Sequence, residues 1–128
     1  MVTGFSWVDA AAVAGPVRAA AAAMAAFVCE DLGLPPVEVV WYDSASRCRG
    51  VYVAIGDGPQ VVGLNVRRAP RQAGRTVAHE LRHAWQSRQG VLSGMAGPEL
   101  EQDARRYAAR AVKRCIVAGS GATVYATI

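Results

Sequence analysis

The only two histidines of the chain lie four residues apart and enclose a glutamate. His79, Glu80 and His83 form the pattern H-E-x-x-H in a segment whose other residues predict a helix. Residues four apart share one face of a helix, with Cβ atoms about 5–6 Å apart. Two imidazoles at that spacing can ligate one Zn²⁺ ion. Glu80 projects from the adjacent strip, so it could accept a proton from water at the metal without being a ligand.

A zinc site of this kind uses a third protein ligand and leaves the fourth position for water. The last predicted helix, residues 98–117, offers carboxylates near its start. Glu101 heads a stripe of small, mostly apolar residues on that helix. They are Ala104, Ala108, Ala111 and Cys115. Because a carboxylate heading a buried stripe needs a partner, we predict that Glu101 is the third ligand.

Asp103 and Glu99 are the alternatives to Glu101. Asp103 shares its stripe with three arginines, at positions 106, 110 and 114, which predicts a solvated face. Glu99 lies in the first turn, where a carboxylate stabilises a helix N-terminus. Asp103 therefore remains the second candidate ligand.

Two helices and a group of strands must position these residues. We expect helices over residues 74–88 and 98–117, with an earlier helix over residues 8–32 that Ser6 caps. The pair Gly15-Pro16 predicts a kink or a fresh start within that first helix, and Gly33 closes it.

Between the first and second helices the apolar residues follow a strand pattern. Residues 37–42, 51–55 and 60–66 are rich in β-branched and aromatic side chains and predict three strands. Gly56-Asp57-Gly58-Pro59 predicts a tight turn, so residues 51–66 should form a hairpin, and residues 123–127 are a candidate fourth strand. Strands grouped beside helices imply an α+β fold, in one domain over residues 1–128.

Composition narrows the class of protein. The 128 residues are 52% hydrophobic, which excludes a disordered chain, and the apolar share is rich in alanine, which predicts close helix contacts. Three cysteines without C-x-x-C spacing indicate reduced thiols, not disulfides or a thiolate zinc site. No apolar run approaches a membrane span, and Arg18 interrupts the alanine-rich segment, unlike a secretory leader. We expect a cytoplasmic protein.

The motifs resemble those of compact zincin metallopeptidases of the gluzincin type, including bacterial and phage-encoded domains. The similar residues are Val77 to Gln86, which contain the H-E-x-x-H motif, and Leu100-Glu101-Gln102-Asp103-Ala104. The resemblance implies zinc held by His79, His83 and Glu101, with Glu80 as general base. The family often has an aspartate after the alanine, where this chain has Arg105. That aspartate orients a ligand histidine, and Asp103 is a candidate to replace it.

The resemblance also implies an extended peptide or protein substrate. In such zincins the last strand before the active helix is an edge strand that pairs with substrate, a position that Val62-Gly63-Leu64-Asn65 occupies here. Hydrolysis also needs a donor for the oxyanion, and Tyr107, Arg110 and Tyr125 are candidates. For Tyr107, two turns after Glu101, we favour the alternative that it packs in the core.

The net charge of +4 comes mainly from arginine, with a run at positions 67, 68, 71 and 75. No aromatic residue interleaves with that run, which argues against nucleic-acid binding, and we expect no membrane partner. We predict zinc-dependent peptide-bond hydrolysis. The alternatives are a catalytically weak, zincin-like zinc module that binds proteins, and a small basic nucleic-acid-associated protein whose H-E-x-x-H is accidental.

Overall fold

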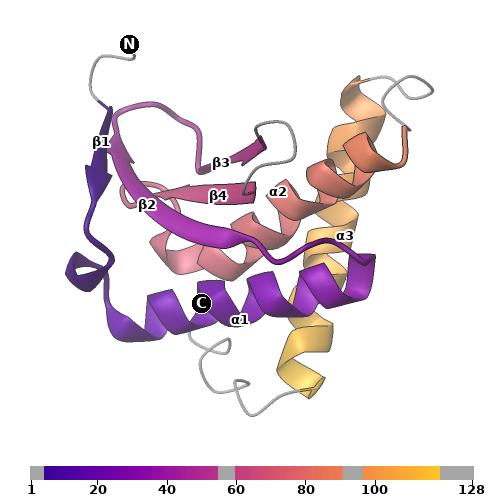
Figure 1. Cartoon of the computed structure of the whole chain (residues 1–128), viewed down its shortest axis with the longest axis horizontal. Coiled ribbons are helices and arrows are strands. Elements are labelled where there is room, and N and C mark those ends of the chain that lie inside the picture. The colour runs from indigo at the N-terminus through magenta and orange to yellow at the C-terminus, as the bar shows by residue number, and fades with distance from the viewer. Residues whose placement is uncertain (1–4, 55–59, 91–96, 119–128) are drawn as a thin grey trace.

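The computed structural model describes residues 5–54, 60–90 and 97–118. Within these ranges it contains three α-helices, one four-stranded mixed sheet and two short 3₁₀ helices. Figure 1 shows helices α1 (Gly15–Leu32) and α2 (Ala73–Arg88) on one side of the sheet, with α3 (Gly97–Ala118) running across them. The predicted α+β class is confirmed. None of the described helices is both long and apolar enough to cross a membrane.

The N-terminal region differs from the prediction of a helix over residues 8–32. Strand β1 (Phe5–Val8) pairs antiparallel with strand β2 (Glu38–Ser44), and a 3₁₀ helix (Ala10–Ala12) follows. The carboxylate of Asp9 accepts a hydrogen bond from the amide of Ala11 at 2.9 Å and so caps the 3₁₀ helix. Helix α1 begins only at Gly15, because Pro16 lacks an amide hydrogen and fits the first turn. Ser6 therefore lies in a strand and caps no helix.

The other elements follow the predicted order. Strands β3 (Gly50–Ala54) and β4 (Gln60–Asn65) pair antiparallel, which confirms the hairpin pairing. The predicted turn at residues 56–59 and the candidate strand at residues 123–127 lie outside the described residues. Strand β2 continues to Ser44, beyond the predicted end at residue 42, because Phe5 and Ser6 pair with Ser44 and Asp43. Helices α2 and α3 begin and end within one residue of their predicted bounds.

The strand order is β1-β2-β4-β3, and β2 and β4 run parallel. Strand β4 therefore has a hydrogen-bonded neighbour on each side: Gly63 pairs with Val40 of β2 and with Val51 of β3. The prediction that Val62-Gly63-Leu64-Asn65 forms an edge strand for substrate is wrong, because no free backbone edge remains there. The strand at the edge on this side is β3.

The core lies between the sheet and helices α1 and α2, and α3 packs against both helices. Buried alanines occur on all three helices and let their backbones approach closely, as the composition predicted. They are Ala20, Ala21 and Ala25 on α1, Ala73, Ala78 and Ala84 on α2, and Ala104, Ala108 and Ala111 on α3. The cysteines are free, with Cys29 and Cys115 buried and Cys48 exposed.

Candidate metal centre

Helices α2 and α3 bring the predicted ligands to one place. The Nε2 atoms of His79 and His83, one turn apart on α2, lie 3.2 Å from each other. Glu101, in the first turns of α3, places Oε1 2.8 Å from Nε2 of His83 and Oε2 3.3 Å from Nε2 of His79. One donor atom from each residue lies within 4.8 Å of the others, so the three form a candidate metal-binding group.

Two of these separations fit a tetrahedral metal ion, while the third, 2.8 Å between Nε2 of His83 and Oε1 of Glu101, is shorter. Ligand atoms at about 2.0–2.1 Å from zinc lie roughly 3.3–3.4 Å from one another in tetrahedral geometry. The separations from Nε2 of His79 to Nε2 of His83 and to Oε2 of Glu101 are 3.2 and 3.3 Å. The three side chains therefore need little rearrangement to share one ion, and their nitrogen and carboxylate donors suit zinc.

A buried glutamine decides which nitrogen of His83 faces the cluster. The amide nitrogen of Gln86 donates to the carbonyl oxygen of Leu100 at 3.0 Å and to Oδ2 of Asp103 at 2.8 Å. Its amide oxygen must then be the acceptor in the 2.7 Å contact with Nδ1 of His83. A neutral His83 that carries its hydrogen on Nδ1 presents the lone pair of Nε2 to His79 and Glu101, as a metal ligand does.

The electrostatics of His79 also suit a ligand. Burial lowers the pKa of His79, and the nearby His83 and Arg105 lower it further, while Glu101 acts in the opposite direction. A neutral imidazole keeps its lone pair for a metal. The carboxylate of Glu101 therefore faces in His79 an imidazole whose protonation burial disfavours, and a metal cation would supply positive charge there.

Glu80 lies next to the cluster and is mostly buried. Burial raises its pKa to about 7, with Glu101 also raising it and His83 lowering it. A carboxylate with a pKa near neutral can exchange protons with water under physiological conditions, which is the requirement for a general base. Glu80 is thus a mostly buried carboxylate with a raised pKa beside the three candidate ligands.

The structure separates the two candidate third ligands. Asp103 does not reach the imidazoles: its carboxylate pairs with Arg82 through contacts of 2.8 and 3.2 Å. Those hydrogen bonds from Arg82, with a smaller contribution from Gln86, lower the pKa of Asp103 despite its burial. The predicted solvated face is confirmed for Arg106, Arg110 and Arg114, which are exposed, whereas the Asp103 side chain is 30% exposed and pairs with Arg82. The position of Asp103 matches the predicted orienting role, because Asp103 holds Gln86 and Gln86 holds His83.

Glu101 also departs from the expected burial. The rest of its stripe is buried, but the Glu101 side chain is 48% exposed. The stripe ends at the rim of a cleft, so Glu101 faces an opening and not the core.

The predicted oxyanion donors do not reach this cleft. The hydroxyl of Tyr107 is buried and donates to Oδ2 of Asp31 at 2.8 Å, and burial together with Asp31 raises the pKa of Tyr107. Arg110 is exposed on α3 and is not among the residues lining the cleft. The prediction that Tyr107 packs in the core is confirmed. Neither Tyr107 nor Arg110 is thus placed as an oxyanion donor in this cleft, and Tyr125 lies outside the described residues.

The cleft, of about 650 Å³, joins the metal cluster to the start of β3. Arg75 and Arg105 line it, together with Arg47 and Arg49 from the β2–β3 loop. Helix spacing could have indicated two of these residues, because Arg75 precedes His79 by four positions and Arg105 follows Glu101 by four. The signal that sequence reasoning missed is that Arg75 shares a helix face with His79, and Arg105 with Glu101.

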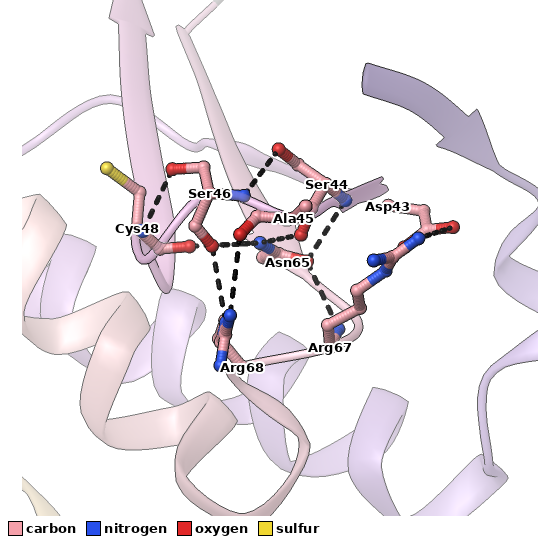
Figure 2. A network of polar contacts seen from close by, with 8 residues as sticks. All are labelled: Asp43, Ser44, Ala45, Ser46, Cys48, Asn65, Arg67 and Arg68. Atoms are coloured by element: carbon pink, nitrogen blue, oxygen red, sulfur yellow. Dashed lines mark hydrogen bonds and ion pairs between the residues drawn. The ribbon is translucent and has the colours of Figure 1, made fainter. Parts of the chain in front are cut away.

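Asn65, predicted to bind substrate, has a different position. Its side chain is fully buried and organises the loop between β2 and β3 (Figure 2). The amide nitrogen donates to the carbonyl oxygens of Ser44 at 3.0 Å and Cys48 at 3.1 Å, and the amide oxygen accepts from the backbone of Arg67 at 3.1 Å. Asn65 thus shapes the loop that carries Arg47 and Arg49 and does not contact the cleft itself.

The chain matches no protein-family model, no curated protein and no solved structure. The chemistry of the site therefore has to be inferred from the arrangement of its own residues.

Proposed function

We propose that the chain is a zinc-dependent peptidase with a minimal zincin-like layout. One observation carries the proposal: His79, His83 and Glu101 converge at ligand distances, and Glu80 lines the same cleft. Zinc, when bound, supplies Lewis acidity, which makes water acidic near neutral pH and polarises a carbonyl group. Every other role falls to side chains of the chain.

Glu80 accepts a proton from the attacking water and returns it to the leaving amine nitrogen. Its partial burial supports this role, because a pKa near 7 allows both steps without a large change in pH. The pair Gln86 and Asp103 keeps the His83 imidazole in the tautomer that faces the metal. In the resembling family an aspartate at the position of Arg105 has that task.

The edge strand β3 is the element best suited to bind an extended peptide. Its outer edge has no partner among the described strands, and its first residue, Gly50, lines the cleft beside His79. A peptide added along β3 would gain main-chain hydrogen bonds and place a carbonyl group near Glu80. Strand addition is thus proposed at β3, in place of β4.

A metal that only joins α2 to α3 is the main rival. Three contacts already join these helices without a metal: Arg82 pairs with Asp103, and Gln86 donates to the carbonyl of Leu100 and to Asp103. A purely structural ion would add little to that connection. The mostly buried carboxylate of Glu80 would also have no role in a structural site.

The test is to compare wild type with Glu80→Gln after loading with zinc. Glu80→Gln should keep one zinc per chain and the same circular dichroism, but hydrolyse a quenched fluorescent peptide library about 100- to 10,000-fold more slowly. Glu99→Gln is the matched control, since Glu99 is exposed in the first turn of α3, outside the cleft. Equal hydrolysis by Glu80→Gln and wild type would contradict the proposal.

A further inference from the structure

The walls of the cleft are strongly basic. Four arginines line it: Arg47, Arg49, Arg75 and Arg105. The acidic side chains that line the described part of this cleft are Glu80 and Glu101, and both already belong to the proposed site. The remaining charged groups of the cleft are therefore all positive.

The four cleft arginines lack a carboxylate partner among the described residues. Six arginines outside the cleft lack one as well: Arg18, Arg68, Arg71, Arg88, Arg106 and Arg110. Three arginines outside the cleft each pair with an aspartate: Arg67 with Asp43, Arg82 with Asp103, and Arg114 with Asp31. Within the described ranges, none of the four cleft arginines has a carboxylate at ion-pair distance, and Arg49 donates only to the neutral amide of Gln72. Their positive charge is left for a ligand.

The arginines approach the metal cluster from three elements. Arg75 lies one helical turn before His79 on α2, and Arg105 lies one turn after Glu101 on α3. Arg47 and Arg49 come from the loop that enters β3. Positive charge therefore flanks the site on more than one side.

The loop that carries Arg47 and Arg49 is held in shape at both ends. At one end, the buried Asn65 binds its backbone, as Figure 2 shows. At the other end, Gly50 packs so closely on α2 that a Cβ there would lie 2.7 Å from Cγ2 of Thr76. A loop fixed in this way presents its side chains to the cleft with little entropy left to lose on binding.

We propose that the cleft selects peptides with carboxylate groups beside the bond held at the metal cluster, an inference that rests on the proposed peptidase function. Guanidinium groups form charge-assisted, often bidentate hydrogen bonds with carboxylates. The carboxylates could be those of Asp and Glu side chains or the C-terminus of the peptide. A nucleic acid fits less well, because no Phe, Tyr or Trp side chain lines the cleft to stack on a base.

Binding to zinc-loaded Glu80→Gln tests this without hydrolysis. The probes are short labelled peptides with Glu or with Gln on both sides of the central bond, each with a free and with an amidated C-terminus. The Glu peptide should bind about tenfold more tightly than the Gln peptide at low salt, and the difference should shrink in about 0.5 M salt. Equal binding of the Glu and Gln peptides, with weaker binding of both after amidation, would assign the recognised carboxylate to the C-terminus.

Variants of the arginines identify the source of the preference. Arg75→Gln with Arg105→Gln, made in the Glu80→Gln protein, should remove most of the tenfold difference. Arg106→Gln, also in that protein, is the matched control, because Arg106 is exposed on α3 next to Arg105 but does not line the cleft. Equal binding of all four peptides, or a preference for carboxylates that survives the double substitution, would overturn the proposal. Tighter binding of a single-stranded oligonucleotide than of the Glu peptide would do the same.

Hydrolysis by the wild type separates this inference from the proposed function. Cleavage of a peptide library with no enrichment of acidic residues around the cut bonds would overturn the carboxylate preference and leave the peptidase standing. Charge-dependent binding without any cleavage would overturn the peptidase, while the cleft would remain a carboxylate-binding site.

Discussion

The amide oxygen of Gln86 lies 2.7 Å from Nδ1 of His83, and both hydrogens of the same amide are used elsewhere. The amide oxygen of Gln86 therefore accepts a hydrogen bond from Nδ1 of His83. This orients the imidazole so that Nε2 of His83 faces His79 and Glu101. The carboxylate of Asp103 completes this arrangement from α3. A fully buried amide with all its hydrogen bonds made has one orientation open to it, which makes it a reliable support for a metal ligand.

Gln86→Met should weaken zinc binding by about 10- to 100-fold, because the imidazole of His83 loses the acceptor that orients it. It should also destabilise the metal-free protein by about 1–3 kcal/mol, since Leu100 and Asp103 each lose a donor. Competition with a chromophoric chelator measures the affinity, and urea denaturation measures the stability. Gln102→Met, at an exposed position on α3, should change neither.

Zinc should raise the melting temperature of the wild type. Metal that binds only the folded chain stabilises it by about 2.7 kcal/mol at a free concentration one hundred times the dissociation constant. His79→Ala and Glu101→Gln should each lose most of this shift, because both residues contribute a donor to the cluster. Thermal unfolding with and without a chelator gives the result. A full zinc shift in Glu101→Gln would remove that residue from the ligand set, and Glu99→Gln should behave as wild type.

Glu80 should make the metal-free protein less stable as the pH rises. Its pKa is about 7 in the folded chain against an ordinary value of 4.5, so the unfolded chain releases this proton first. Between pH 4.5 and 7 the folded state therefore loses stability relative to the unfolded state, and the loss is complete above pH 7. Glu80→Gln should be more stable than wild type by roughly 2–4 kcal/mol at pH 8 and nearly equal to it at pH 4. Urea denaturation of both proteins at the two pH values, with a chelator present, measures this; a constant difference would contradict it.

Asp31 should contribute to acid denaturation. Burial favours its neutral form, but hydrogen bonds from Tyr107 and Arg114 outweigh burial and lower the pKa of Asp31 below its ordinary 3.8. A lowered folded-state pKa means stabilisation above pH 3.8 that disappears as the pH falls through the folded-state value. Asp31→Asn should cost about 1–2 kcal/mol at pH 7 and progressively less below pH 3.8. Asp43→Asn removes a solvent-exposed ion pair with Arg67 and should lower the free energy of unfolding by less than Asp31→Asn does. An equal loss in both variants would contradict the prediction that the Asp31 contacts stabilise the fold more than an exposed ion pair.

Asn65→Ala should loosen the loop between β2 and β3. The carbonyl oxygens of Ser44 and Cys48 lose their donor, which should destabilise the fold by about 2 kcal/mol or more. Limited proteolysis should then cut within residues 44–49 sooner than in wild type, at a denaturant concentration where both proteins are folded. An unchanged cleavage rate would show that the loop does not depend on Asn65.

The residues of the metal cluster were predictable because the relevant patterns are local. The spacing of His79 and His83 places both on one face of any helix, and the stripe headed by Glu101 selects one carboxylate among three by the same periodicity. The bounds of α2 and α3 were predictable for that reason too. The β-branched and aromatic residues likewise indicated the strands at residues 37–42, 51–55 and 60–66.

The order of the strands was decided only in the tertiary structure. Nothing local shows that β2 pairs with β4 and not with β3, which follows it in the sequence. Nothing local shows either that Phe5–Val8 forms a strand that pairs with β2. Strand pairing depends on partners distant in sequence, and the alternation along Val62-Gly63-Leu64-Asn65 is compatible with an edge or an interior position. The structure resolves this in favour of the interior and leaves β3 at the edge of the cleft.

The contacts made by the residues around the candidate metal ligands were also decided only in the tertiary structure. The sequence by itself determined which side chains could share a metal, because helix geometry acts over four residues. Only the packing of α3 on α2 decided that Asp103 binds Gln86, that Tyr107 turns away to Asp31, and that unpaired arginines line the cleft. Those contacts join residues of different elements, and their geometry exists only once the helices have packed.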